Sequence, residues 1–508
     1  MAKGNSGLAK SLLSMGSAMV ILLGINFFLT PFVTEKLGAD AYGFITLANN
    51  IVSYAMMLTT ALNSFATRYI AVEYHRGNCR GASCYLSSLL IANGAVCAVI
   101  FTAMLVFVIN INGILQVPDH LLNDVQYLFV LVFVNFLFTN GSAAFSSAAY
   151  VKDRLDLYGL FQSLSYVVEA LALIVLYLVL PPHVLYFGVG IALAGLVLLS
   201  GNIYIYRKVC PEIQVSFSLF SFSAVKTLLF SGLWNSFNQL GNILNSGLSL
   251  LVANMFLNPI AMGQVAISQV FTTVSRRLYQ LISQVYQPRL LKYYSNGDMT
   301  NLCSELTSAM KVSALIGCLI FAGYWSLGLV FNSLWIPSQD INLIYKLALV
   351  VLFSEIAVAP IFPLYFIYTL TVKNKIPAIV TIIGGISSVV LMAALIKLGF
   401  GAFSVVIPTT LINCIINGVV NPLYMARCLR IKLSTFFPTL LRVDLLGIVM
   451  CVLFTVLRNA ICPITWLSFC VCAILCLVVG LLAFLVIAFD PNERKQLLSF
   501  VNRKQQEL

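Results

Sequence analysis

Two neighbouring arginines, Arg276 and Arg277, are the residues of this sequence whose type and position point most directly to chemistry. They interrupt a long apolar stretch between residues 262 and 288, where a charge costs roughly 2.5 to 3.5 kcal/mol on membrane-insertion scales. A guanidinium presents a planar fork of donors that matches phosphate oxygens, and it stays charged where water is scarce. The pair therefore predicts a site for an anionic headgroup; the alternative is that both side chains snorkel toward the cytoplasm.

Amide and hydroxyl side chains also interrupt three of the apolar segments at regular intervals. Within each segment the spacing is helical, which places the polar groups on one face. The residues that we expect to bind substrate on these faces are Gln269, Gln280, Gln284, Asn49, Ser53, Asn235, Asn238 and Asn242. Since lipid does not solvate amides, we expect the faces to line a hydrated cavity between two halves of the protein; the alternative is hydrogen-bonded links between helices.

Three further ionisable residues lie within apolar segments. Lys311 either adds a third positive charge to the headgroup site or is an interfacial lysine. Glu169 and Glu355 are expected to be counter-ions of the basic residues, and the alternative is that one of them carries a coupling ion or proton.

Composition shows what must position these residues. Of the 508 residues 60% are hydrophobic and only 9% are charged. A bilayer core needs about 20 apolar residues for each helical crossing and excludes open strands, so the sequence predicts an all-α polytopic membrane protein of about fourteen transmembrane helices. The expected spans lie near residues 12–35, 42–66, 84–110, 123–149, 158–180, 184–205, 228–256, 262–288, 304–331, 343–371, 376–396, 402–425, 438–457 and 464–489.

Basic residues sort by side of the membrane. Most of the 29 Lys and Arg residues fall in the two tails and in every second connection, which argues against nucleic-acid binding despite the net charge of +12. By the positive-inside rule, both termini lie in the cytoplasm of a multi-pass protein of the inner or plasma membrane. Lys3 and Lys10 precede the first span, which we interpret as a helix and not as a cleaved signal peptide.

An internal repeat appears when the sequence is shifted against itself by 220 residues. Tyr42-Gly43 then aligns with Met262-Gly263, and the segment 74–78 aligns with 294–298. A unit of six helices inserts twice in one orientation, so the repeats are parallel. We expect a first lobe over residues 1–210, a second over 211–432, an additional helix pair over 433–490 and a cytoplasmic tail over 491–508.

Signatures of catalysis and metal binding are missing from the sequence. Residues 4–11 lack the glycine that precedes the lysine of a P-loop, and the three histidines lie far apart. The connections expected outside the membrane hold no sizeable domain. We therefore expect a transporter and not an enzyme, with no catalytic residue, metal ligand or cofactor.

The turn Leu37-Gly38-Ala39-Asp40-Ala41-Tyr42-Gly43 and the apolar segment after it resemble the polysaccharide transporter branch of the MATE/MOP superfamily, the Wzx-like oligosaccharide flippases. The segments 258–263 and 334–337 extend this resemblance over roughly the first 430 residues. It implies two six-helix lobes that open alternately to either side. It also implies an oligosaccharide substrate joined through pyrophosphate to a polyprenyl lipid, with amides on the sugars and arginines on the pyrophosphate.

The extra C-terminal helices are similar to those of lipid II flippases, where such a pair frames a groove for the lipid tail. Those flippases also carry arginines in their first two helices, which this chain lacks, so lipid II itself is not expected. The resemblance predicts movement of the substrate to the outer leaflet for surface polysaccharide such as O-antigen or capsule. Glycosyltransferases or a polymerase of the same pathway are candidate partners. The alternatives are a sodium- or proton-coupled multidrug exporter of the same superfamily and a non-transporting scaffold for glycan assembly.

Overall fold

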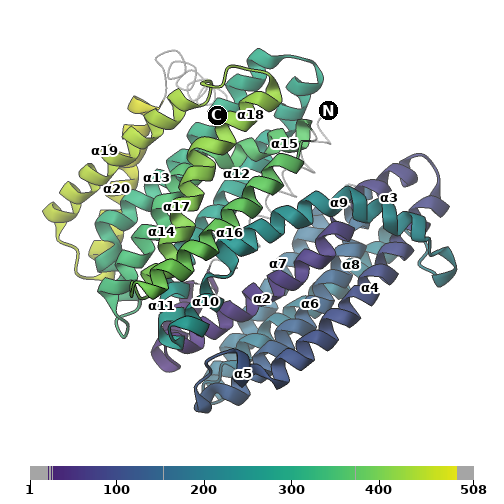
Figure 1. Ribbon diagram of the computed structural model, residues 1–508, viewed down its shortest axis with the longest axis horizontal. Helices are drawn as coiled ribbons and strands as arrows, with labels where there is room; N and C mark the ends of the chain where they lie inside the picture. The colour runs from purple at the N-terminus through teal and green to yellow at the C-terminus, as the bar shows by residue number, and fades with distance from the viewer. Residues whose placement is uncertain (1–20, 22–23, 26, 153, 372, 489–508) are drawn as a thin grey trace, which may run out of the picture. The chain divides into compact units, whose positions relative to one another are not determined.

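The chain is a multi-pass membrane protein built from helices (Figure 1). The computed structural model describes residues 21, 24–25, 27–152, 154–371 and 373–488, and it contains no strand within these ranges. Eleven helices in this part of the chain are long and apolar enough to cross a bilayer. The expected spans near 228–256 and 262–288 are helical but are not among the eleven, because their amides and arginines lower their hydropathy.

Two of the expected segments fall partly or wholly outside the described residues. They are the first span, near 12–35, of which residues 21, 24–25 and 27–35 are described and helical, and the tail 491–508. With that partly described helix and the two polar segments, the described helices agree with the expected all-α fold of about fourteen spans.

Packing divides the described chain into two compact units. Unit 1 contains the chain up to Ala266 together with Thr381–Ile386, and unit 2 contains Ile267–Val380 and the chain from Ser387 onward. The repeat boundary expected at residue 211 therefore differs from the boundary between the compact units. The repeat boundaries themselves remain predictions from the sequence.

Unit 1 is a helical bundle in which α6 and α7 both pack against α8, and α2 packs against α9. Its elements are α2 (Ala39–Asn63), α3 (Ala66–His75), α4 (Cys79–Ile109), α5 (Ile111–Ile114), η1 (Asp119–Leu121), α6 (Leu122–Val151), α7 (Leu155–Val179), α8 (Leu185–Val209), η2 (Phe217–Leu219), α9 (Phe222–Asn242), η3 (Ile243–Gly247), α10 (Ser249–Phe256) and α11 (Pro259–Ser268), whose last residues pass into unit 2.

Hydrogen bonds hold the connection before α9 on unit 1. Ser83, Ser87 and Ser88 of α4 accept hydrogen bonds from the backbone N–H groups of Gln214, Ser216 and Ser221, at 2.9, 3.1 and 2.9 Å. Gly232 then brings α9 against α2, since a Cβ at this position would lie 2.0 Å from the Ala61 carbonyl oxygen. These contacts explain why α9 packs with unit 1, although the sequence predicts that it begins the second repeat.

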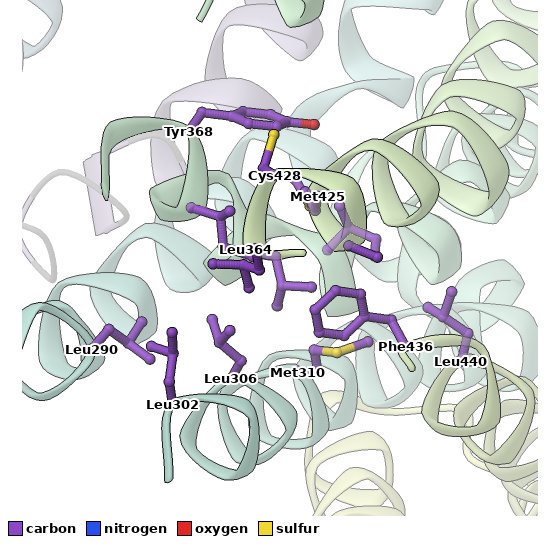
Figure 2. Close-up of a cluster of buried hydrophobic side chains, with 14 residues drawn as sticks. Leu290, Leu302, Leu306, Met310, Leu364, Tyr368, Met425, Cys428, Phe436 and Leu440 are labelled. Atoms are coloured by element: carbon purple, nitrogen blue, oxygen red, sulfur yellow. The ribbon is translucent and has the colours of Figure 1, made fainter. Parts of the chain in front are cut away.

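Unit 2 contains the remaining helices. They are α12 (Val270–Ser295), α13 (Met299–Trp335), α14 (Ile341–Ile361), η4 (Phe362–Tyr365), α15 (Phe366–Thr371), α16 (Lys375–Lys397, divided between the units), α17 (Phe403–Ile415), η5 (Ile416–Val420), α18 (Asn421–Leu429), α19 (Phe437–Ile461) and α20 (Trp466–Ile487). Figure 2 shows the apolar cluster that joins α12, α13 and α18, with Leu290, Leu306 and Met425 among its buried members. The C-terminal pair packs on α13, where Cys318 and Val443 belong to one buried cluster (Figure 1).

Two turns at positions aligned by the 220-residue shift have the same geometry. Gly77 and Gly297 have φ angles of 79° and 71°, a left-handed conformation that glycine adopts without strain. The next residues, Asn78 and Asp298, cap α4 and α13 by accepting hydrogen bonds from the N–H groups three residues later, at 2.9 and 3.1 Å. The same turn therefore occurs at positions that the 220-residue shift aligns.

Several long helices are interrupted where the sequence predicts one continuous span. The span near 343–371 breaks into α14, η4 and α15 at Pro360 and Pro363, because proline removes a backbone donor and clashes with the preceding turn. The spans near 228–256 and 402–425 each contain a π-helical turn, at η3 and η5. Such turns occur frequently at functional sites.

Candidate functional site

An ion pair occupies the expected headgroup region of unit 2. Arg276 on α12 places Nε 3.3 Å from Oε1 of Glu355 on α14. The Glu355 side chain is 1% exposed, whereas that of Arg276 is 39% exposed. A buried carboxylate without a cation would be strongly unfavourable, so Arg276 is needed to neutralise Glu355. Arg276 is therefore only partly available to a ligand.

Arg277 differs from its neighbour in both exposure and contacts. Its side chain is exposed, and it makes no ion pair or hydrogen bond with any residue that the structure describes. Gln280 and Gln284 follow on the same helix and are also exposed. These three residues form a polar ribbon along α12. Apolar lipid does not satisfy such a face, so the ribbon requires water or a polar ligand.

A network of tyrosine and asparagine side chains lies beside the ion pair and was not predicted. Tyr365 in η4 lies close enough to Arg276 and Glu355 to interact with them electrostatically, and its hydroxyl donates to Asn417 Oδ1 in η5. Asn421 also donates to Asn417 Oδ1, at 2.9 Å, and accepts from the Tyr368 hydroxyl at 2.8 Å. The network thus connects the two helix interruptions of unit 2.

The polar faces expected on α2 and α9 both lie in unit 1, on helices that pack together. Asn49 is exposed and Ser53 half-buried, and each donates to a carbonyl four residues earlier, at 3.2 and 3.1 Å. In these bonds the side chains act as donors, so the side-chain oxygens of both residues can still accept a hydrogen bond from a ligand. On α9, Asn235 is half-buried and Asn242 is exposed.

Asn238 has a partner within unit 1. It is exposed and accepts from Thr381 Oγ1 at 3.0 Å. That bond fits the alternative interpretation of the stripes, namely a link between helices. Gln269, at the junction of α11 and α12, is half-buried.

The remaining charged residues named from the sequence are buried. Lys311 on α13 is 3% exposed, and its two interpretations remain predictions. Glu169 on α7 is 6% exposed, and it makes no ion pair or hydrogen bond with any described residue. Of the two expected counter-ions, Glu355 alone is paired with a cation in the part of the chain that the structure describes.

Unit 2 contains a groove of about 760 Å³ that the sequence did not predict. Helices α13, α14, α17 and α19 supply its walls, which are mostly apolar. Trp325, Phe353 and Val452 line it and are 47%, 54% and 59% exposed, so it is open along one side. Asp444 is the one ionisable carboxylate in this lining.

Comparisons with known proteins establish the fold. No protein-family model matches the chain. The uncharacterized membrane protein EpsK of Bacillus subtilis is 28% identical over 422 residues, which cover 83% of each chain.

Two solved structures are similar over most of their length. An inward-facing MATE multidrug resistance transporter of the MOP superfamily matches with a TM-score of 0.66 and 12% identity, over 81% of this chain and 94% of its own. The lipid II flippase MurJ, in an inward closed conformation, matches with a TM-score of 0.60 and 16% identity, over 92% of this chain and 98% of its own. The chain therefore has the fold shared by these MOP-superfamily transporters and flippases.

Proposed function

We propose that this protein is a flippase that moves a polyprenyl-pyrophosphate-linked oligosaccharide from the cytoplasmic to the outer leaflet by alternating access, for surface polysaccharide biosynthesis. The observation that carries the proposal is Arg277, an exposed cation on the polar ribbon of α12 that is unpaired among the described residues. A cation in that setting favours an anionic ligand.

The chemistry of the ribbon fits both parts of the headgroup. The Arg277 guanidinium matches the geometry of phosphate oxygens and forms charge-assisted hydrogen bonds to them. Gln280 and Gln284 each present donors and an acceptor, which suit sugar hydroxyls. In this proposal Arg277 is the principal pyrophosphate ligand, and Arg276 contributes the part of its charge that Glu355 does not neutralise.

The groove in unit 2 supports a lipid substrate. Its apolar walls and its open side suit a long hydrocarbon chain that remains in contact with the bilayer. MurJ, which is by its name a flippase for a lipid, matches a larger share of this chain than the multidrug transporter does. A larger matched share is expected if the C-terminal helix pair has a counterpart in MurJ.

Glu169 is the better of the two carboxylates for an ion-coupling role. Glu355 is already neutralised by Arg276, whereas Glu169 is buried in unit 1 with no cation within hydrogen-bonding distance among the described residues. A buried carboxylate in that setting is stabilised by binding a proton or a cation. We therefore assign coupling, if the flippase is coupled, to Glu169.

The competing function is multidrug export, which the name of one structural neighbour states for that protein. An exporter of cationic aromatic drugs would bind them more tightly with acidic or aromatic groups at its site. An arginine without a counter-ion repels such drugs electrostatically, which favours the flippase.

Transport by the purified protein in liposomes separates these functions. We expect a fluorescent polyprenyl-pyrophosphate oligosaccharide to cross the bilayer when the protein is present, and ethidium to show no protein-dependent flux. Flux of ethidium alone would establish the exporter, and absence of flux for both probes would favour a scaffold.

A further inference from the structure

We propose that Arg458, at one end of the unit 2 groove, binds the pyrophosphate of the polyprenyl substrate while its chain lies in the groove. This inference rests on the proposed function and deepens it, because it assigns a second headgroup site distinct from the α12 ribbon.

The groove has charges of opposite sign at its two ends. Asp444 and Val456 both line it from α19 and lie twelve residues apart, so the groove follows that helix for about 18 Å at a rise of 1.5 Å per residue. Arg458 lies two residues beyond Val456. Arg442 lies two residues before Asp444, so the two charges offset each other at that end, and the Arg458 end is the more favourable one for an anionic lipid headgroup.

Arg458 is held in position at its end of the groove. Its Nη1 donates to the carbonyl oxygen of Ser326 at 3.3 Å, directly after the groove residue Trp325. Its Nε and Nη2 donate to Asn459 Oδ1 at 3.1 and 2.7 Å. A guanidinium has five N–H donors, so these three bonds fix the fork and leave two donors for a ligand.

Asp444 has the opposite properties. It lines the groove, its side chain is exposed, and it makes no ion pair or hydrogen bond with any described residue. Its carboxylate makes this end of the groove less favourable for a pyrophosphate than the Arg458 end. The apolar chain is unaffected by this charge, so the polarity that places the headgroup at Arg458 is favoured.

The polarity has a consequence for transport. By the distribution of Lys and Arg, the Arg458 end of α19 faces away from the cytoplasm. A substrate held by Arg458 with its chain in the groove thus has its headgroup on the outer side. We assign this arrangement to the substrate after translocation and before its release.

Binding of a lipid probe beside Trp325 tests the proposal. The full-length protein is prepared in nanodiscs with Trp234, Trp335 and Trp466 replaced by phenylalanine, so that Trp325 is the one remaining tryptophan. Quenching of its fluorescence is titrated with nitroxide-labelled polyprenyl pyrophosphate and with the matching polyprenol. Cross-linking of a diazirine-bearing polyprenyl pyrophosphate to the protein with all its tryptophans, mapped by mass spectrometry, gives a second readout if the substitutions disturb folding.

We expect Arg458→Gln to weaken binding of the pyrophosphate about tenfold, the loss of one charge-assisted hydrogen bond, and to leave polyprenol binding unchanged. Arg458→Lys should retain part of the preference, and Asp444→Asn should not weaken binding. The matched control is Lys397→Gln, which removes an exposed basic residue at another helix end of unit 2.

An unchanged preference for the pyrophosphate in Arg458→Gln would overturn the proposal. So would the absence of quenching and cross-linking in the groove, or displacement of the probe by an equal amount of phosphatidylglycerol. If liposome transport fails while the Arg458-dependent preference persists, the flippase assignment is wrong and the groove site still stands.

Discussion

Arg276 Nε and Glu355 Oε1 lie 3.3 Å apart and join α12 to α14 within unit 2. Removal of the arginine leaves a carboxylate that is 1% exposed without its cation. A change from Arg276 to alanine should therefore destabilise the protein, by about 2 kcal/mol, less than for a fully buried pair because Arg276 is partly exposed. Thermal unfolding in detergent measures the effect.

A second substitution, at Glu355, tests whether loss of the ion pair is the cause of the destabilisation. Arg276→Gln combined with Glu355→Gln removes both charges, and its stability should lie above that of Arg276→Gln alone. Equal stability of the single and double variants would show that the two side chains are not coupled. Because of this coupling, Arg276 variants are a poor test of headgroup binding.

Glu169 should affect ion dependence without affecting the fold. The carboxylate has no partner to lose among the described residues, so Glu169→Gln should leave the melting temperature unchanged or slightly higher. Transport in liposomes should then lose its response to a sodium or proton gradient. If Glu169→Gln retains the gradient response, the coupling assignment is wrong.

Gly263 and Gly43 are related by the 220-residue shift, and they also contact each other within unit 1. A Cβ on Gly43 would lie 2.9 Å from the Gly263 nitrogen, and one on Gly263 would lie 2.0 Å from the Ala39 carbonyl oxygen. Gly263→Ala should therefore separate α2 from α11 and reduce stability by about 1–3 kcal/mol. Circular dichroism during heating measures the loss.

Gly94 in α4 provides the matched control, because nothing lies within 4 Å of a Cβ at that position. Alanine there should stabilise the helix by roughly 0.5–1 kcal/mol through its lower backbone entropy in the unfolded chain. Similar losses for both alanine variants would contradict the close contact at Gly263.

Asp298 should give the start of α13 a pH dependence. Hydrogen bonds from the backbone N–H of Asn301, and then from its side-chain amide, lower the pKa of the Asp298 carboxyl. The cap is therefore fully formed above the ordinary pKa of about 4 and weakens as the pH falls through the lower, folded value. Hydrogen exchange of the first amides of α13, corrected for intrinsic rates, should show this loss of protection.

The repeat suggests the control for that measurement. Asn78 caps α4 in the same turn with a neutral amide, but this amide also donates to the Glu73 carboxylate at 2.7 Å. In a Glu73→Gln background, therefore, protection of the first α4 amides should stay constant over the same pH range. The substitution Asp298→Asn should likewise keep the α13 cap and remove its pH dependence. A pH profile at α13 that is the same in this variant as in the wild-type protein would contradict the role of the carboxylate.

Hydropathy predicted the helices well, since a bilayer leaves few alternatives for long apolar segments. It did not predict the π-helical turns at η3 and η5. Pro360 and Pro363 were visible signals for the break in α14. The division of the chain into packed units could not be read from the repeat, because the serine contacts of α4 hold α9 on unit 1.

For the site, the sequence identified the charges but not their pairing. Arg276 and Arg277 are neighbours in sequence, yet one side chain pairs with Glu355 and the other remains exposed. Asn413, Asn417 and Asn421 lie four residues apart, which also places them on one face of a helix, and this spacing was a usable signal for the network of unit 2. The groove required the packing of four helices that are distant in sequence.

Translocation of a labelled polyprenyl-pyrophosphate oligosaccharide by reconstituted Arg277→Gln is the sharpest test of the headgroup site on α12. We expect the initial rate to fall at least about tenfold, because the variant loses a charge-assisted contact to the pyrophosphate, and the melting temperature to stay unchanged. Lys292→Gln, which removes an exposed cation from the same helix, should transport at the wild-type rate. Wild-type transport by Arg277→Gln would contradict the proposed headgroup site.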